Sequence, residues 1–320
     1  MAATCLIAAL SACRRDTAPP AAGRTPVWLD ISPAIGDPPR DPGDALALLQ
    51  AYGSGTLLVR GVSVTFGNVP VVRGYAAAQE VLQRLDSGVL RAWHGASAPE
   101  ERVAATEATA LLEEALRKQS LTIVATGPAT TIASVLLRHP ELATRIERVI
   151  LVAGTPVDAN VSGDSAIAKH DVNASADEQS LQVLLDSPLS LTLVRAGLGT
   201  GVGLDAGDLD RLDRERGPIA LITPGARSWL ETSTGSDGAF AVPAMLAVDV
   251  AAHPGALRCE QAVAVMVSAP AGPGLRARPA ARLGVAIRTA GRRVTWCHTA
   301  DSGAKDRVIA DVRRVRQRAR

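Results

Sequence analysis

Residues 27–49 combine an apolar run, an acidic loop and the start of a helix, and this order restricts the folds open to the chain. The apolar run Val27-Trp28-Leu29 ends at Asp30 and has the character of a short buried strand. The loop that follows contains residues that exclude a helix, namely Pro33, Pro38, Pro39 and Pro42. Asp44 precedes an apolar run, where the free N–H groups and dipole of a helix N-terminus favour a carboxylate. Open α/β folds bind ligands at such strand-to-helix loops.

The same alternation continues along the chain. Residues 56–65 (TLLVRGVSVT) have the composition of a strand, and residues 71–85 have the apolar spacing of an amphipathic helix. Further strands are predicted at residues 121–126, 145–154, 188–195, 262–267, 283–287 and 293–297, and further helices at 103–117, 209–214, 226–231, after Gly127 and from Ala304. The predicted fold class is α/β, with an open, mostly parallel, doubly wound sheet flanked by helices. No strand precedes a Gly-rich dinucleotide fingerprint, which disfavours a nicotinamide or flavin enzyme.

Asp30, Asp37, Asp41 and Asp44 lie close together in the sequence and have two interpretations. Several carboxylates on one loop are what Ca²⁺ or Mg²⁺ requires. Asp is also common in turns, so the same residues describe a solvated acidic turn with Asp44 as the helix cap. From spacing alone the turn is favoured.

Residues 30–44 resemble the N-terminal signature of the inosine/uridine-preferring nucleoside hydrolases. In that family the first strand ends in Asp-x-Asp and the next helix begins with Asp-Asp, and one branch carries a longer loop with a Pro-Ala-Ile-Gly segment, as in residues 33–36 here. The resemblance implies hydrolysis of the N-glycosidic bond of ribonucleosides at a Ca²⁺ site. Asp30 and Asp44 match the first and last acids of the signature, whereas Ser32 and Gly43 replace the other two. Ser32 stands at the position of the general base, so no catalytic residue is assigned.

Two later positions correspond to Ca²⁺ ligands of the family. Thr126 matches a threonine that binds Ca²⁺ through its backbone carbonyl. Ala244 stands where the family has an aspartate ligand, and it has no side-chain oxygen. Asp249, one to two helical turns further on, is expected to face elsewhere. The implied metal ligands are therefore Asp44 and Thr126, and the remaining candidates are Asp30, Asp37 and Asp41.

Asn68, Asp171 and Asn173 match family positions that contact or lie near the ribose, so the resemblance makes them the substrate-binding residues. Asp177 matches the cap of the next helix. The implied ligand is a nucleoside or another ribosyl compound.

The substitutions at residues 32, 43 and 244 remove three family carboxylates together. Because Ca²⁺ affinity follows the number and charge of the ligands, Ca²⁺ is expected to bind weakly or not at all. An unactivated serine hydroxyl is too weak an acid to replace the base, and loss of a base commonly removes about 10²–10⁴ of rate.

Three hypotheses follow. The first is a hydrolase with a rewired site, in which Asp37 or Asp41 replaces the lost ligands. The second is a non-catalytic protein that binds a ribosyl or polyol ligand, and the third is a scaffold or interaction protein. On the residues alone, the second and third together outweigh the first, although the family names the ancestral reaction.

Residues 1–26 are interpreted as a lipoprotein leader and tether, and residues 27–320 as a single nucleoside hydrolase-like domain. Leu10-Ser11-Ala12-Cys13 resembles the bacterial lipobox, which would place a lipid anchor on Cys13 and the domain at the cell envelope. The apolar run before it is short and lacks a basic residue, so an ordinary N-terminus and a cytoplasmic protein remain the alternative.

The remaining composition is less specific. Cys259 and Cys297 are expected to be free buried thiols, although they could pair in an oxidising compartment. The formal net charge of +2 implies no strong nucleic-acid partner. The basic residues 313–320 are interpreted as the solvated end of the last helix. Whether the chain forms a homo-oligomer is left open.

Overall fold

The computed structural model describes residues 23–36, 38–85, 91–157, 171–198, 202–233, 238–269, 280–286 and 290–315. Its centre is a ten-stranded sheet in the order β3-β2-β1-β4-β5-β7-β12-β10-β11-β6, with a separate pair β8-β9. Neighbouring strands are parallel from β3 to β12 and antiparallel for β12-β10 and β10-β11. The predicted mostly parallel α/β sheet is confirmed.

The strands are β1 (Thr25–Ile31), β2 (Leu57–Val64), β3 (Ala92–His94), β4 (Leu121–Ala125), β5 (Ile146–Val152), β6 (Thr155–Pro156), β7 (Leu191–Val194), β8 (Leu204–Asp205), β9 (Ala239–Phe240), β10 (Leu257–Ala269), β11 (Ala280–Ala286) and β12 (Arg292–Ala300). The α-helices are α1 (Gly43–Gly53), α2 (Val71–Leu85), α3 (Glu107–Lys118), α4 (Thr130–Arg138), α6 (Val172–Ala176), α7 (Glu178–Asp186), α8 (Ala206–Asp213), α9 (Thr223–Ser233), α10 (Pro243–Ala252) and α11 (Ala304–Arg313). Three 3₁₀ turns are η1 (Pro99–Val103), η2 (Pro140–Arg145) and η3 (Gly217–Leu221).

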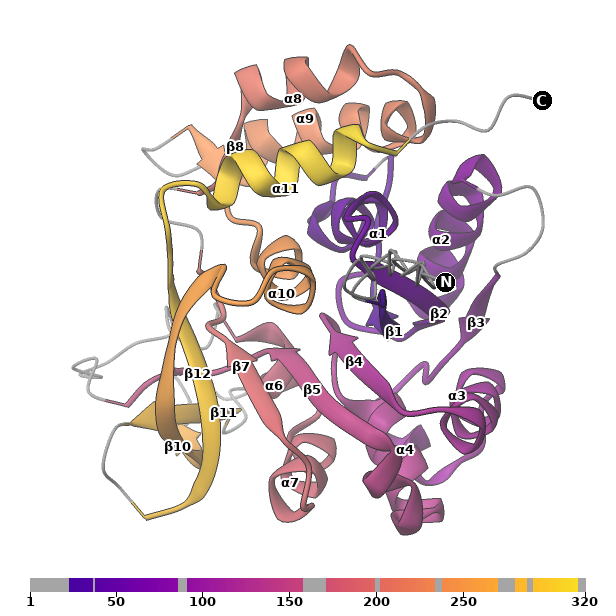
Figure 1. Ribbon diagram of the computed structural model, residues 1–320, viewed down its shortest axis with the longest axis vertical. Helices are drawn as coiled ribbons and strands as arrows, with labels where there is room; N and C mark the ends of the chain where they lie inside the picture. Colours follow the sequence, from indigo (N-terminus) through magenta and orange to yellow (C-terminus); the bar gives the residue numbers. More distant parts are fainter. Residues whose placement is uncertain are drawn as a thin grey trace, which may run out of the picture.

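Helices cover both faces of the sheet, and β1 shows how the sequence divides between them. Val27, Leu29 and Ile31 pack with α1, α2, α10 and α11, whereas Trp28 packs with α3, α4 and α7 on the other face. The alternation follows from the period of two in a strand. In Figure 1, α1, α10 and α11 lie above the sheet and α3, α4 and α7 below it. Both faces of β1 are therefore buried, as its continuous apolar run indicates.

One predicted helix begins later than expected. The helix predicted at residues 103–117 is α3, which starts at Glu107. The side chain of Thr106 accepts a hydrogen bond from the N–H of Thr109 at 3.2 Å and caps it. The preceding turn η1 starts at Pro99 and is a separate element. The cap residue, and not the apolar spacing, fixes the start of α3.

The prediction of free thiols was wrong. Cys259 of β10 and Cys297 of β12 lie opposite each other in the antiparallel pair, with their Cα atoms 4.0 Å apart, and they form a disulfide. Strand pairing brings together residues that are 38 apart in the sequence, which the local apolar context of each cysteine does not show.

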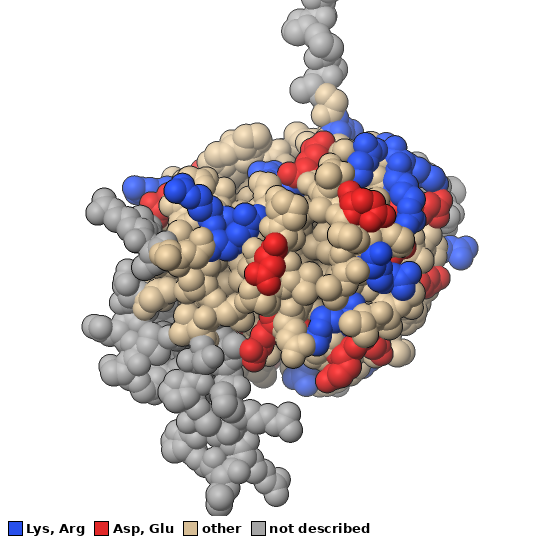
Figure 2. All heavy atoms as spheres, turned by 90° about the horizontal axis from the view of Figure 1, so that it is seen from below, with Lys and Arg blue, Asp and Glu red and all other residues tan. Residues whose placement is uncertain are grey.

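The side of the molecule seen in Figure 2 carries charges of both signs. On the side seen in Figure 2, Lys and Arg side chains alternate with Asp and Glu side chains. Within the described part of the chain, no helix has the length and apolar character needed to cross a bilayer. Cys13 and the predicted leader lie outside the described residues.

Candidate functional site

A cavity of about 460 Å³ opens at the carboxyl ends of the parallel strands. Ser32 follows β1, Thr126 follows β4 and Val152 ends β5, so consecutive strands of the sheet supply its floor. The first turns of α1, α6 and α10 and the residues after β2 and β7 supply the walls, together with α9 and β9. This is the position at which open α/β sheets bind ligands. The cavity brings together most of the residues singled out in the sequence: Ser32, Asp41, Gly43, Asp44, Asn68, Thr126, Asp171, Asn173 and Ala244.

Asp41 occupies the space left by Gly43. Its Oδ1 accepts a hydrogen bond from the Gly43 N–H at 2.8 Å. A Cβ built on Gly43 would lie 3.0 Å from this Oδ1 and 3.7 Å from the Cβ of Ala244. The carboxylate of Asp41 thus lies where a side chain at position 43 would begin. Asp37, the other candidate for this role, lies outside the described residues.

Asp44 lies in the first turn of α1 and is not its cap, because Pro42 holds the cap position. Its Oδ2 accepts a hydrogen bond from the Ser32 N–H at 2.6 Å, which joins the end of β1 to the start of α1. Burial raises the pKa of Asp44, while the Ser32 N–H and the Thr126 hydroxyl oppose the change. Burial also raises the pKa of Asp41 to about 6, and the adjacent charge of Asp44 adds to this. Two neighbouring carboxylates in a poorly solvated site attract a cation.

Ser32 and Asn68 connect the two loops above the sheet. The Ser32 hydroxyl accepts a hydrogen bond from the Asn68 N–H at 3.1 Å. The Asn68 amide donates to the carbonyl of Ser32 at 3.2 Å and to that of Asp41 at 2.8 Å. Asn68 therefore holds the loop that carries Asp41 in place, in addition to lining the cavity.

The Thr126 carbonyl, the family's metal ligand position, already accepts a hydrogen bond. The donor is the Asn173 side-chain amide, at 2.6 Å, which also donates to the Val152 carbonyl at 3.0 Å. Because a carbonyl oxygen has a second lone pair, Thr126 retains one acceptor site. Asn173 thereby joins the ends of β4 and β5.

Asp171 caps the short helix α6. Its Oδ1 accepts from the Ala174 N–H at 3.2 Å and its Oδ2 from the Gly154 N–H at 2.9 Å. Burial raises its pKa to about 6, and these backbone donors oppose the rise. Asp177, which was predicted to be the next cap, caps α7 through the Ser180 N–H at 3.0 Å.

Asp30 lies below the cavity and is not among the residues that line it. The Trp28 indole N–H donates to the Ser63 hydroxyl at 2.8 Å, and that hydroxyl donates to Asp30 Oδ1 at 2.5 Å. Burial raises the pKa of Asp30 to about 7; the Ser63 and Thr131 hydroxyls oppose the rise and the charge of Asp44 increases it.

Asp30→Asn is expected to make the stability of the protein depend less on pH between about pH 5 and about pH 8. The folded carboxyl ionises near 7 and the unfolded one near about 3.9, so the folded state binds more protons between these values and stability falls as pH rises through 7. Between about pH 5 and about pH 8 the wild type should lose about 2–3 kcal/mol relative to the variant. Urea unfolding of both proteins in EDTA measures this difference. Parallel pH curves for the two proteins would contradict it.

Trp229 of α9 and Phe240 of β9 also line the cavity, and neither was among the predicted site residues. Residues 209–214 and 226–231 were both predicted to be helices that flank the pocket. α9 lines the cavity through Trp229, whereas no residue of α8 lines it. Three of the described lining residues are carboxylates (Asp41, Asp44 and Asp171), and none is Lys, Arg or His. The cavity thus combines carboxylates with aromatic side chains in its lining.

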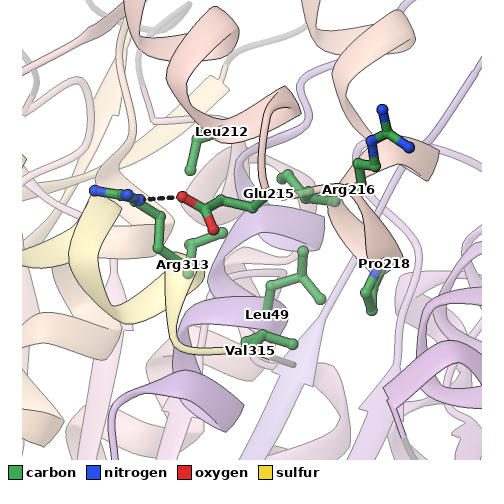
Figure 3. Close-up of a pocket in the computed structure, with 9 residues that line it drawn as sticks. Leu49, Leu212, Glu215, Arg216, Pro218, Arg313 and Val315 are labelled. Carbon is green, nitrogen blue, oxygen red and sulfur yellow. Dashed lines mark hydrogen bonds and ion pairs between the residues drawn. The ribbon is translucent and has the colours of Figure 1, made fainter. Parts of the chain in front are cut away.

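A second hollow, between α1, η3 and α11, is a packing seam (Figure 3). Leu49, Leu212 and Val315 fill it, and Glu215 accepts a hydrogen bond from Arg313 at 2.5 Å across its rim. It has no room for a ligand, so the functional site is the large cavity.

The model of the inosine-uridine preferring nucleoside hydrolases matches residues 27–315. The chain belongs to this family. Its members use a metal ion and act on nucleosides. The match includes the strands and helices that build the cavity.

Individual relatives are more distant. The pyrimidine-specific ribonucleoside hydrolase RihA of Salmonella typhimurium is 28% identical over 211 residues, which cover 57% of this chain and 66% of RihA, just under two thirds of its length. The inosine-uridine preferring nucleoside hydrolase of Bacillus anthracis has a similar fold, with a TM-score of 0.69 and 15% identity over 91% of this chain and 100% of that one. The purine-preferring ribonucleoside hydrolase of Gardnerella vaginalis also has a similar fold, with a TM-score of 0.69 and 16% identity over 90% of this chain and 98% of that one.

Proposed function

We propose that this protein hydrolyses the N-glycosidic bond of ribonucleosides in the large cavity, with Asp41 in place of the family carboxylate that Gly43 lacks. The observation that carries the proposal is the position of Asp41 Oδ1, 3.0 Å from the Cβ site of Gly43. Asp41 precedes Gly43 by two residues, but its carboxylate lies next to the position that a side chain at residue 43 would occupy. The rewired-site hypothesis is favoured over the others on this ground.

The cavity offers oxygen donors that suit a hard cation such as Ca²⁺. Asp41 and Asp44 supply two carboxylates, Thr126 a carbonyl and Ser32 a hydroxyl. No described cationic side chain in the lining competes for the two carboxylates. A bound divalent cation would lower the pKa of a water molecule in the cavity.

The chain's own residues have distinct roles in the reaction. Asp41 accepts the proton of the attacking water. The carboxylates of the cavity stabilise the positive charge that develops on the ribose as the N-glycosidic bond breaks. Asp171 and Asn173 lie on the side of the cavity next to β5 and receive the ribose hydroxyls, while the aromatic rings of Trp229 and Phe240 face the planar base.

A second candidate is a protein that binds a ribosyl or polyol ligand without cleaving it. It is favoured by Ala244, which brings a methyl group to the cavity in place of a ligand oxygen. It is also favoured by the hydrogen bonds that the Thr126 carbonyl and Asp44 accept from Asn173 and Ser32.

Calorimetric titration with Ca²⁺, followed by hydrolysis assays with uridine, cytidine, inosine and adenosine, separates the two candidates. The hydrolase predicts saturable Ca²⁺ binding and release of free base, both lost in Asp44→Asn. This variant keeps the acceptor for the Ser32 N–H, so the loop connection survives. Binding of a nucleoside without release of base, in Ca²⁺ at millimolar concentration, would support the second candidate and reject the first.

A further inference from the structure

Three ligand-type side chains meet outside the cavity, between α10 and α11. Asp249 lies on α10, His253 is the C-cap of the same helix, and Asp311 lies on α11. One potential ligand atom from each lies within 4.8 Å of the other two. Asp249 and Asp311 are buried, whereas 28% of the His253 side chain is exposed. Since α10 rises about 1.5 Å per residue, the cluster is roughly 7–14 Å along the helix from Ala244 at the cavity.

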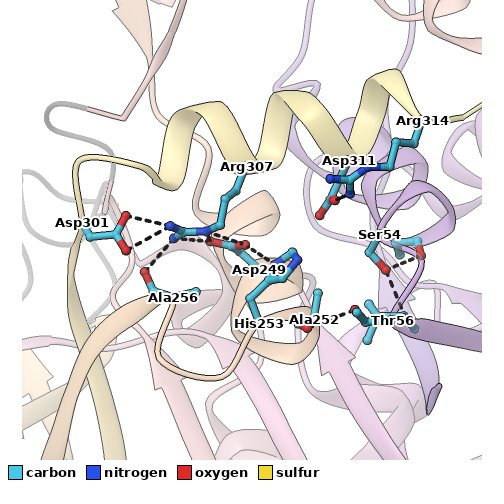
Figure 4. Close-up of polar contacts among 12 residues, drawn as sticks. Ser54, Thr56, Asp249, Ala252, His253, Ala256, Asp301, Arg307, Asp311 and Arg314 are labelled. Atoms are coloured by element: carbon cyan, nitrogen blue, oxygen red, sulfur yellow. Dashed lines mark hydrogen bonds and ion pairs between the residues drawn. The ribbon is translucent and has the colours of Figure 1, made fainter. Parts of the chain in front are cut away.

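Each carboxylate is held by an arginine and turns an oxygen toward the cluster (Figure 4). Arg307 binds Asp249 Oδ2 at 3.0 Å, and Asp249 Oδ1 lies 2.8 Å from His253 Nδ1. Arg314 pairs with Asp311 Oδ1. Asp311 Oδ2 is buried and has no hydrogen-bond partner.

The described groups around this free oxygen supply no donor to it. Arg307 pairs with Asp249 and Asp301, Arg314 pairs with the other oxygen of Asp311, and His253 contacts Asp249, so each of these ion pairs leaves the free oxygen without a partner. A buried carboxylate oxygen without a donor costs free energy. A cation beside Asp311 Oδ2 would supply the missing partner.

We propose that Asp249, His253 and Asp311 form a binding site for a divalent transition-metal ion of the zinc and cobalt class. One imidazole and two carboxylates are ligands that Zn²⁺ accepts in tetrahedral sites. The ion replaces the proton between Asp249 and His253. Three protein ligands leave a fourth position for water, and the partly exposed His253 provides the entrance. The arginines position the carboxylates from behind, as outer partners do in metal sites.

The ion would join α11 to α10 near the point where α11 also meets α1. A Cβ on Gly53, the last residue of α1, would lie 1.8 Å from the Asp311 carbonyl, so only glycine permits this approach. The site therefore serves to hold the last helix on the fold, and it does not depend on the reaction proposed for the cavity.

The test is a calorimetric Zn²⁺ titration of the metal-free chain in excess Ca²⁺, repeated with Co²⁺ by visible absorption. One Zn²⁺ should bind, and Co²⁺ should give absorption bands of a low-symmetry site with nitrogen and oxygen ligands. His253→Gln and Asp311→Asn should each lower the Zn²⁺ affinity by more than the 10–100-fold typical of an outer partner, that is, by over ~100-fold. The control is His139→Gln. His139 is also partly exposed and contacts the carboxylates of Glu113 and Glu141, and its substitution should leave the Zn²⁺ affinity unchanged.

The cavity is tested in the same series. Asp41→Asn should retain Zn²⁺ binding. Absence of saturable Zn²⁺ binding in the wild type would overturn the proposal, as would wild-type affinity in His253→Gln. If Asp41→Asn were the variant of the series that lost Zn²⁺ binding, and the others kept it, the ion would lie in the cavity. This result would also overturn the proposal. Should Asp311→Asn fail to fold, the partly exposed His253 still decides the question.

Discussion

Asp41→Asn is expected to lower kcat for ribonucleoside hydrolysis by about 10²–10⁴-fold, the range for loss of a general base. Asparagine keeps the oxygen that accepts the Gly43 N–H, so the loop geometry should survive. It cannot take a proton from water and it removes one of two charges that attract the cation. The effect should appear in kcat with saturating Ca²⁺, measured by release of free base.

Moving the carboxylate back to position 43 provides the decisive control. In Asp41→Ala the Oδ1 that lies 3.0 Å from the Cβ site of Gly43 is absent, which leaves room for a side chain there. Asp41→Ala/Gly43→Asp should therefore recover at least ~10-fold of the activity lost in Asp41→Ala, since an acid in the first turn of α1 is also favoured by the helix dipole.

The single variant Gly43→Asp should instead lose activity. It places a new carboxylate against Asp41 in a site where the charge of Asp44 already raises the pKa of Asp41. If the double variant is no more active than Asp41→Ala, Asp41 does not replace the missing residue. Equal hydrolysis by wild type and Asp41→Asn would reject its role as base.

The alternation of apolar strands and amphipathic helices was sufficient to predict the α/β sheet, because burial of each strand depends on its own sequence. The resemblance to the family is what assigned Ser32 and Thr126 to one site. Both line the cavity, because parallel strands end at one edge of the sheet. The position of Asp41 was not predictable from spacing. It depends on how a proline-rich loop folds and on the amide of Asn68 that binds its backbone.

Contacts between distant segments are the least predictable from the sequence. Asp249 was correctly expected to face away from the cavity, but its partner Asp311 lies 62 residues later, on a helix that only the folded sheet brings near. The Cys259–Cys297 pair was missed for the same reason, since the register of β10 against β12 is a property of the sheet.

Trp28→Ala is expected to have the largest effect on stability, a loss of about 3–5 kcal/mol in the free energy of unfolding. Trp28 is 2% exposed, and it lies directly across β1-β2 from Gly61. A Cβ on Gly61 would lie 2.1 Å from the Trp28 ring, so the ring fills the space that a side chain there would take. The indole N–H of Trp28 also donates a hydrogen bond to the Ser63 hydroxyl, which in turn donates to Asp30.

Substitutions at Trp28 and Gly61 should be strongly coupled, because the Trp28 ring occupies the space that a side chain at residue 61 would need. Gly61→Ala alone should cost at least about 1–3 kcal/mol through overpacking. In the Trp28→Ala background the same change should cost nothing or stabilise the protein. The new methyl group enters the space that the ring has left, and alanine lowers the conformational entropy of the unfolded chain relative to glycine. Urea unfolding of the four proteins measures this coupling, with Trp28→Phe showing the smaller cost of losing the N–H. Additive effects of Trp28→Ala and Gly61→Ala would mean that the ring relaxes away from Gly61. The tight contact would then not determine how β1 carries Ser32 to the cavity.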